Sequence, residues 1–111
     1  MVSIKPPRRG EIWLAALDPT LGCEIQKTRP CVIVSPPEMN DYLRTLVVAP
    51  MTTGSRPAPF RIPIAFQRKN GLILLDQLRT VDRQRLVKRL GAAKPATLAS
   101  VLDGLQAMFA P

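Results

Sequence analysis

The sequence contains no histidine and only two cysteines among its 111 residues. Histidine is the commonest general acid or base in enzymes, so any catalysis by this chain must use Glu, Asp, Lys, Tyr or Arg. A zinc site would need both thiols together with carboxylates, which is an improbable ligand set, and we expect no metal or other cofactor. Two cysteines are too few for a disulfide framework. Cys31 begins an apolar run, and we expect it to be a small core residue.

Long apolar segments are also missing. No run approaches the roughly 20 residues that a membrane-spanning helix needs. The N-terminal stretch MVSIKPPRRGEIW has no apolar centre of the kind that signal peptides carry. A basic amphipathic helix and a lipidation signal are absent as well. These features predict a cytoplasmic protein.

Acidic residues are scarce. The chain has 16 Lys and Arg against 8 Asp and Glu, which leaves a net charge of +8. This surplus makes a polyanion the expected partner, either a nucleic acid or an acidic protein. The hydrophobic share of 46% is ordinary for a globular protein. A chain of this length is expected to form one domain over residues 1–111.

Twelve prolines and six glycines divide the chain into short segments, a pattern that favours a compact β-rich fold over a helical bundle. Apolar and alternating residues predict strands over residues 10–17, 31–35, 45–50, 60–64, 71–78 and 86–90. Pro63 places the strand over residues 60–64 at a sheet edge or bulge. Residues 38–43 follow Pro37 and are expected to form a single helical turn.

The last segment has a helical period. Its apolar residues share one face of an α-helix that begins near Pro95: Leu98, Val101, Leu102, Leu105 and Phe109. A helix with one apolar face must pack on another element, and we expect this face to cover the sheet or barrel formed by the preceding strands.

The stretch GCEIQKTRPCVIVS, residues 22–35, joins a polar loop to an apolar strand. Glu24 and Arg29 lie in the loop, and Pro30 stiffens the backbone where the strand begins. One interpretation is a solvated turn before a core strand. The other is an acid and a base held for chemistry on a phosphate. The spacing alone leaves both open.

Several short fragments occur in a fixed order: RGEIW at 9–13, DPT at 18–20, G-x-E at 22–24, RP at 29–30, VSP at 34–36, P-x-T-T at 50–53 and DQ-x-R at 76–79. Together they resemble the MazF/PemK (Kid) toxins of bacterial type II toxin–antitoxin modules, over about residues 8–110. The resemblance implies a mainly β fold, a small SH3-like (PemK/CcdB-like) barrel with a C-terminal helix. It also implies a homodimer that cleaves single-stranded RNA without a metal and that an acidic MazE-like antitoxin inhibits.

Metal-free cleavage of RNA by its own 2′-hydroxyl needs a base, hydrogen-bond donors around the developing charge, and a proton for the leaving 5′-oxygen. Glu24 is the best candidate base, and the nearby cations favour its ionised form. The guanidinium of Arg29 can bind two phosphate oxygens. By resemblance, Thr52 adds a hydroxyl to the same phosphate. The resemblance further implies products with 2′,3′-cyclic phosphate and 5′-hydroxyl ends.

Other polar residues are expected to bind the RNA. A dense basic stretch can follow a nucleic-acid backbone, although a run of charges is also typical of a solvated face. In some relatives a matching aspartate is argued to act in catalysis, while an aspartate at this position can also hold its own turn. The expected RNA-binding residues are Lys27, Thr53, Asp76, Gln77, Arg79, Arg83 and Arg85.

The chain departs from the family pattern at Cys23, where some members have a histidine, so a mechanism that relies on that imidazole does not apply here. Trp13 is expected in the core or a dimer interface rather than as a stacking platform for bases. Two other functions remain open, a non-catalytic CcdB-like toxin that binds DNA gyrase and an RNA-binding relative that leaves RNA intact. Neither has a physical reason to keep Glu24, Arg29 and Thr52 together.

Overall fold

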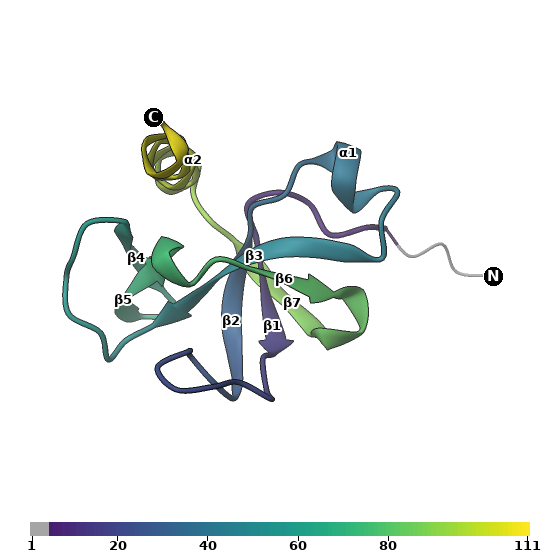
Figure 1. Ribbon diagram of the computed structural model, residues 1–111, viewed down its shortest axis with the longest axis horizontal. Helices are drawn as coiled ribbons and strands as arrows, with labels where there is room; N and C mark the ends of the chain where they lie inside the picture. The colour runs from purple at the N-terminus through teal and green to yellow at the C-terminus, as the bar shows by residue number, and fades with distance from the viewer. Residues whose placement is uncertain (1–4) are drawn as a thin grey trace.

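A computed structural model describes residues 5–111 (Figure 1). Residues 1–4 lie outside the described residues. They belong to the N-terminal stretch in which the sequence shows no apolar centre typical of a signal peptide. In chain order the elements are β1 (Glu11–Ala16), β2 (Thr28–Ile33), α1 (Pro37–Asn40), β3 (Thr45–Thr52), β4 (Arg61–Phe66), β5 (Lys69–Leu74), the 3₁₀ turn η1 (Leu75–Gln77), β6 (Arg79–Asp82), the 3₁₀ turn η2 (Arg83–Arg85), β7 (Leu86–Ala92) and α2 (Pro95–Phe109). None of the helices within residues 5–111 is long and apolar enough to span a membrane.

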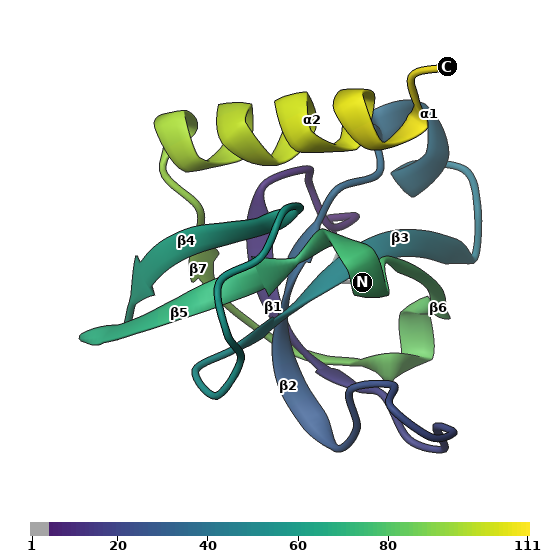
Figure 2. The same ribbon diagram turned by 60° about the vertical axis from the view of Figure 1, so that its left-hand side comes forward.

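The strands form one antiparallel sheet that curls on itself. Its hydrogen-bonded order is β4-β5-β3-β2-β1-β7, and β6 pairs with β3 outside this path. The first half of β3 pairs with β6, whereas its last residues pair with β5. Because β3 changes partner along its length, the sheet bends into a half-barrel with α2 lying across one side (Figures 1 and 2). The expected mainly β, barrel-like fold with a C-terminal helix is confirmed.

Both faces of the central strands are apolar. Val32 and Ala49 belong to the cluster beneath α2, whereas their neighbours Ile33 and Val48 belong to a second cluster on the other face. Side chains alternate between the faces of a strand, so a strand buried on both sides reads as a continuous apolar run. This is the physical reason that CVIV and TLVVA are recognisable as strands in the sequence.

Ser35 and Asn40 are the buried polar residues between β2 and β3. The Ser35 hydroxyl lies 2.6 Å from Asn40 Oδ1 and accepts from the Val47 amide at 3.0 Å, and Asn40 Nδ2 donates to the Ser35 carbonyl at 2.8 Å. These bonds hold the short helix α1 against β3. The VSP fragment at 34–36 therefore has a structural role.

Helix α2 packs through its middle on β4 and η1. A Cβ at Gly104 would lie 2.7 Å from Leu75 Cδ1, so the glycine lets the helix approach the turn closely. Val101 is fully buried, as predicted for this face. The expectation that Phe109 also packs on the sheet is wrong, because its side chain is 71% exposed. Phe109 is the last residue of α2 and lies beyond the part of the helix that packs on Leu75.

Several boundaries differ from those predicted. The strand expected over 71–78 stops at Leu74, where the chain turns through η1. Strand β6 was not predicted, because Val81 is its one buried apolar residue and a single such residue gives no strand pattern. Gln67 and Arg68 form the β4–β5 turn with φ of 51° and 63°, values typical of a type I′ turn, although neither is Asn or Gly. β4 is a terminal strand of the sheet, which confirms the edge position predicted from Pro63.

Candidate active site

Glu24 lies on the loop between β1 and β2, residues 17–27. The Leu17 amide donates to the Lys27 carbonyl at 3.0 Å and closes the base of the loop. Lys27 has a positive φ of 73°, and its amide donates to the Asp18 carboxylate at 3.0 Å. This bond supports a backbone conformation that is uncommon outside glycine. The polar segment is thus a closed loop with a defined shape.

Two arginines from β6 and η2 hold the base of this loop. Arg79 Nη1 donates to the Leu17 carbonyl at 3.0 Å, and Arg85 Nη1 donates to the carbonyls of Ala16 at 3.1 Å and Asp18 at 2.6 Å. The sequence predicted both cations as RNA ligands. The structure gives them a loop-supporting role that sequence reasoning missed, because the contacts join residues 62 to 69 positions apart.

Glu24 is exposed at the far end of the loop. Its Oε1 accepts from the Leu21 amide at 2.5 Å, and its own amide donates to the Leu21 carbonyl at 3.1 Å. Within residues 5–111 only this carboxylate oxygen is engaged, so Oε2 is open to a substrate. Glu24 lines a hollow of about 380 Å³ together with Cys23, Ile25, Asp76, Gln77, Leu78 and Arg79.

Arg29 and Thr52 meet on neighbouring strands. The sequence placed Arg29 in the loop, but it lies within β2 and pairs with Ala15 of β1. The β2–β3 ladder ends where Cys31 is opposite Pro50, and two residues beyond this pair on each strand Arg29 and Thr52 line the same hollow. Pro30 and Pro50 have no amide hydrogen to donate to a ladder, and this lack favours its end here.

This second hollow has a volume of about 220 Å³ and is lined by residues of β2 and β3 together with residues of β4 and β5. It is lined by Arg29, Pro30, Met51, Thr52, Thr53, Ile64, Phe66, Gln67, Lys69 and Gly71. Two cations and two hydroxyls around an open hollow are suited to binding a phosphate. Lys69 was not predicted as a site residue, because it follows the β4–β5 turn, which the sequence does not mark.

Short contacts fix the polar groups of this second hollow. Arg29 Nε donates to the Gln26 carbonyl at 2.9 Å, so Arg29 lines one hollow and is bound to the loop that lines the other. Thr52 Oγ1 accepts from the Gly54 amide at 3.2 Å, which leaves its hydrogen free to donate. A Cβ at Gly71 would lie 2.7 Å from the Thr52 carbonyl oxygen. Glycine is therefore required for β5 to approach Thr52.

Other predicted residues are placed differently. Thr53 lines the second hollow, and Lys27 is exposed on the loop that carries Glu24, whereas both carboxylate oxygens of Asp76 bind Arg61. Arg83 does not join the site. Its Nε donates to the Leu43 carbonyl at 2.7 Å just before β3, whereas Thr52 is the last residue of β3, and Arg83 lines neither hollow.

Two further side chains that the sequence singled out are structural. Cys31 is fully buried, and burial raises the pKa of its thiol to about 12 even though Arg79 and Arg29 lower it, as suits a core residue. Trp13 packs against the second core cluster, and its Nε1 donates to Glu11 Oε1 at 3.0 Å.

Comparison with known proteins gives consistent matches over almost the whole chain. Residues 8–109 match the family described as PemK-like, MazF-like toxin of type II toxin–antitoxin system. The chain is 41% identical to Endoribonuclease PemK of Escherichia coli over 107 residues, which are 91% of this chain and 80% of that protein. It is 36% identical to Endoribonuclease MazF of Staphylococcus epidermidis over 104 residues, 88% of this chain and 87% of that protein.

The fold is similar to a solved structure as well. The crystal structure of MazF (Form-I) from Deinococcus radiodurans matches with a TM-score of 0.83 and 25% sequence identity. The match covers 95% of this chain and 97% of the other, so the half-barrel and the C-terminal helix are both included.

Proposed function

Because the chain belongs to the PemK-like, MazF-like toxin family of type II toxin–antitoxin systems, we propose that it is an endoribonuclease that cleaves single-stranded RNA, including mRNA, at selected sequences without a metal ion. The observation that best supports this proposal is the second hollow, which Arg29 and Thr52 line together while Arg29 is bound to the Glu24 loop. A purely binding protein has no need of this combination.

The proposed reaction uses the RNA 2′-hydroxyl as the nucleophile. The Glu24 carboxylate takes the hydroxyl proton, the 2′-oxygen attacks the adjacent phosphorus, and the bond to the 5′-oxygen breaks. Arg29 and Thr52 donate to the phosphate oxygens on which negative charge develops. A guanidinium keeps its proton in proteins, so Arg29 stabilises charge rather than acting as an acid. The leaving 5′-oxygen takes a proton from a solvent water molecule, so the products carry a 2′,3′-cyclic phosphate and a 5′-hydroxyl.

In this proposal the RNA backbone runs from the Glu24 hollow to the Arg29 hollow. Thr53 and Lys69 line the Arg29 hollow, and Lys27 lies on the loop that carries Glu24, so all three would contact neighbouring phosphates. Arg79 and Arg85 contribute through the loop whose carbonyls they bind. Arg83 is left out because it lies at the other end of β3.

We further propose that the chain acts as a homodimer in the cytoplasm, where mRNA is found. The partner that silences it would be an acidic MazE-like antitoxin. The net charge of +8 supports this choice, because opposite charges speed the encounter of such a partner with the basic surface. Higher salt should slow that association.

The activity is tested by incubating the purified protein with a long single-stranded RNA in excess EDTA and mapping the fragment ends. Wild type should give discrete cuts with cyclic phosphate ends. Arg29→Ala should cut about 10²- to 10³-fold more slowly, because it removes a donor to the developing charge. Arg44→Ala removes the same charge at the start of β3, far from Thr52, and should cut at the wild-type rate.

Two outcomes would contradict the proposal. Equal rates for Arg29→Ala and wild type would remove Arg29 from the site. RNA that is bound but stays intact would favour a non-catalytic toxin, and binding to DNA gyrase would then be measured.

A further inference from the structure

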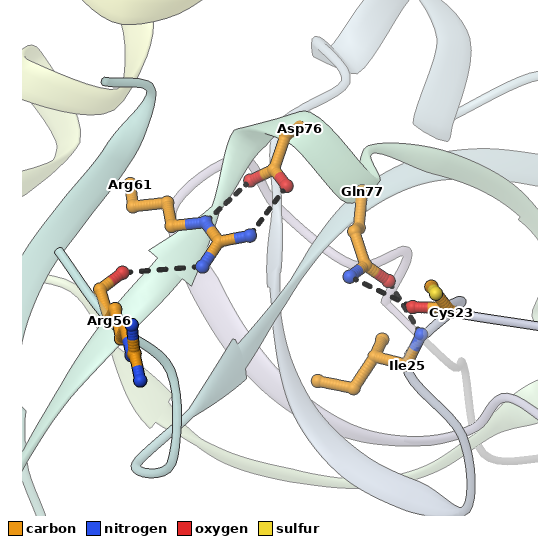
Figure 3. Close-up of polar contacts among 6 residues, drawn as sticks. All are labelled: Cys23, Ile25, Arg56, Arg61, Asp76 and Gln77. Carbon is orange, nitrogen blue, oxygen red and sulfur yellow. Dashed lines mark hydrogen bonds and ion pairs between the residues drawn. The ribbon is translucent and has the colours of Figure 1, made fainter. Parts of the chain in front are cut away.

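Gln77 binds the Glu24 loop on both sides of Glu24 (Figure 3). Its side-chain oxygen accepts from the Ile25 amide at 2.5 Å, and its Nε2 donates to the Cys23 carbonyl at 3.5 Å. An amide side chain carries an acceptor oxygen and a donor nitrogen on two separate atoms at its tip, so it can bind a backbone amide and a backbone carbonyl together. The backbone of the residues before and after Glu24 is therefore held by one side chain from η1.

Asp76, the preceding residue, is directed to a different loop. Its two carboxylate oxygens accept from Arg61 Nε at 3.3 Å and Nη2 at 3.1 Å, a two-pronged pairing (Figure 3). Arg61 Nη1 donates in turn to the Arg56 carbonyl at 3.2 Å. Arg56 lies in the loop between β3 and β4, residues 53–60, which follows Thr52.

The turn that carries both side chains is anchored in the core. Leu75 is buried, its amide donates to the Phe60 carbonyl at 3.0 Å, and Gly104 of α2 packs closely on it. Asp76 and Gln77 thus project from a supported base toward two loops on opposite sides of the turn.

The engagement of Asp76 also argues against direct contact with RNA. Both of its oxygens are already paired with Arg61, and a free carboxylate would repel phosphate. Gln77 has both of its polar atoms on the loop backbone. Neither side chain is therefore suited to being a ligand of the substrate.

We propose that Asp76 and Gln77 are positioning residues that hold loops 17–27 and 53–60 at a fixed separation. This separation sets where Glu24 stands relative to Arg29 and Thr52, and it shapes the space between the loops that an RNA sequence must fit. The inference rests on the proposed nuclease function and assigns both residues an indirect role in rate and in sequence selection.

The first test measures amide hydrogen exchange in the free protein, so its result is independent of whether RNA is cut. Gln77→Met keeps a long side chain and removes both bonds, and should speed exchange in loop 17–27 alone. Asp76→Ala should speed exchange in loop 53–60 alone. The matched controls are Gln106→Ala and Asp103→Ala on the exposed side of α2, which should change neither loop. Unchanged exchange in both loops would overturn the proposal.

The second test separates positioning from direct RNA contact. Gln77→Met should lower kcat by about 100-fold with a smaller change in KM, because a misplaced base slows the chemical step. Asp76→Ala and Arg61→Ala should each relax the set of cleaved sequences, and the double variant should be no worse than either single variant. Effects that multiply in the double variant, or a Gln77→Met defect confined to KM, would show direct binding instead.

Discussion

At the scale of single residues, Glu11 shows how one carboxylate ties together distant parts of the chain. It accepts hydrogen bonds from the Arg8 amide at 2.9 Å, Trp13 Nε1 at 3.0 Å and Arg89 Nε at 2.9 Å. Burial raises the pKa of Glu11, but these donors and the charge of Arg89 together outweigh burial and lower the pKa below its usual 4.5. The ionised form is thus favoured in the folded protein.

This shift predicts a pH dependence of stability. A carboxyl group whose pKa is lower in the folded than in the unfolded state stabilises the fold above the unfolded value, near 4.5, and this contribution is lost as the pH falls through the folded value. Glu11→Gln should lower the free energy of unfolding at about pH 7 and lose less stability than wild type on acidification to about pH 3. Urea unfolding at both pH values measures this, with Glu38→Gln as an exposed control. Parallel curves for wild type and Glu11→Gln would contradict the prediction.

At the scale of elements, the site depends on how closely β5 approaches β3. Met51 and Thr52 pair with Ile73 and Leu72, and Gly71 follows in the same register against the Thr52 carbonyl. The obstacle to a larger residue at Gly71 is backbone, which cannot rotate away as a side chain can. Thr52 can therefore occupy its position only because Gly71 on the facing strand has no side chain.

Gly71→Ala should both destabilise the fold and impair the site. The added methyl group would lie 2.7 Å from the Thr52 oxygen, and overpacking of this kind costs about 1–3 kcal/mol. Urea unfolding and the rate of RNA cleavage measure the two effects. Gly54→Ala is the matched control for the stability measurement, because the nearest contact of its added methyl group, Thr52 Oγ1, would be at 3.9 Å. Equal stability and activity for Gly71→Ala and wild type would show that β3 and β5 separate without cost.

At the scale of the whole molecule, the surplus of positive charge should govern the affinity for RNA. Three cations, Lys27, Arg29 and Lys69, lie at or near the proposed RNA path. Each phosphate that is neutralised on a single strand contributes about −0.7 to the slope of log K against log salt concentration. The affinity should therefore fall with salt.

The expected slope for these three contacts is about −2, and Lys69→Ala should reduce its magnitude by about 0.7. Binding would be measured with an RNA whose 2′-hydroxyls are replaced by hydrogen, which removes the nucleophile and keeps the phosphates. Lys94→Ala, an exposed lysine before α2, is the control for charge alone. A slope that Lys69→Ala leaves unchanged would place the RNA elsewhere on the surface.

The sequence reveals those structural features that produce a local motif or a periodic pattern of apolar residues. Continuous apolar runs predicted the strands that are buried on both faces, and the helical spacing from Leu98 onward predicted α2. The family fragments predicted the fold and the toxin family, and Pro63 predicted an edge strand. β6 went unpredicted because its pairing with β3 and not local propensity stabilises it, and the β4–β5 turn went unpredicted because Gln67 and Arg68 are not residues typical of such a turn.

By itself, therefore, the sequence determined the strands that are buried on both faces, the helix α2, the family and most of the residues that could carry the chemistry. Only the tertiary structure decided what those residues contact: Arg29, Thr52 and Lys69 line one hollow, and Gln77, Arg79 and Arg85 hold the Glu24 loop. The physical reason is that these polar contacts join single groups far apart in the chain, 52 to 69 positions for the loop supports. A backbone carbonyl exists at every residue, so no pattern in the sequence records which one a distant side chain will reach.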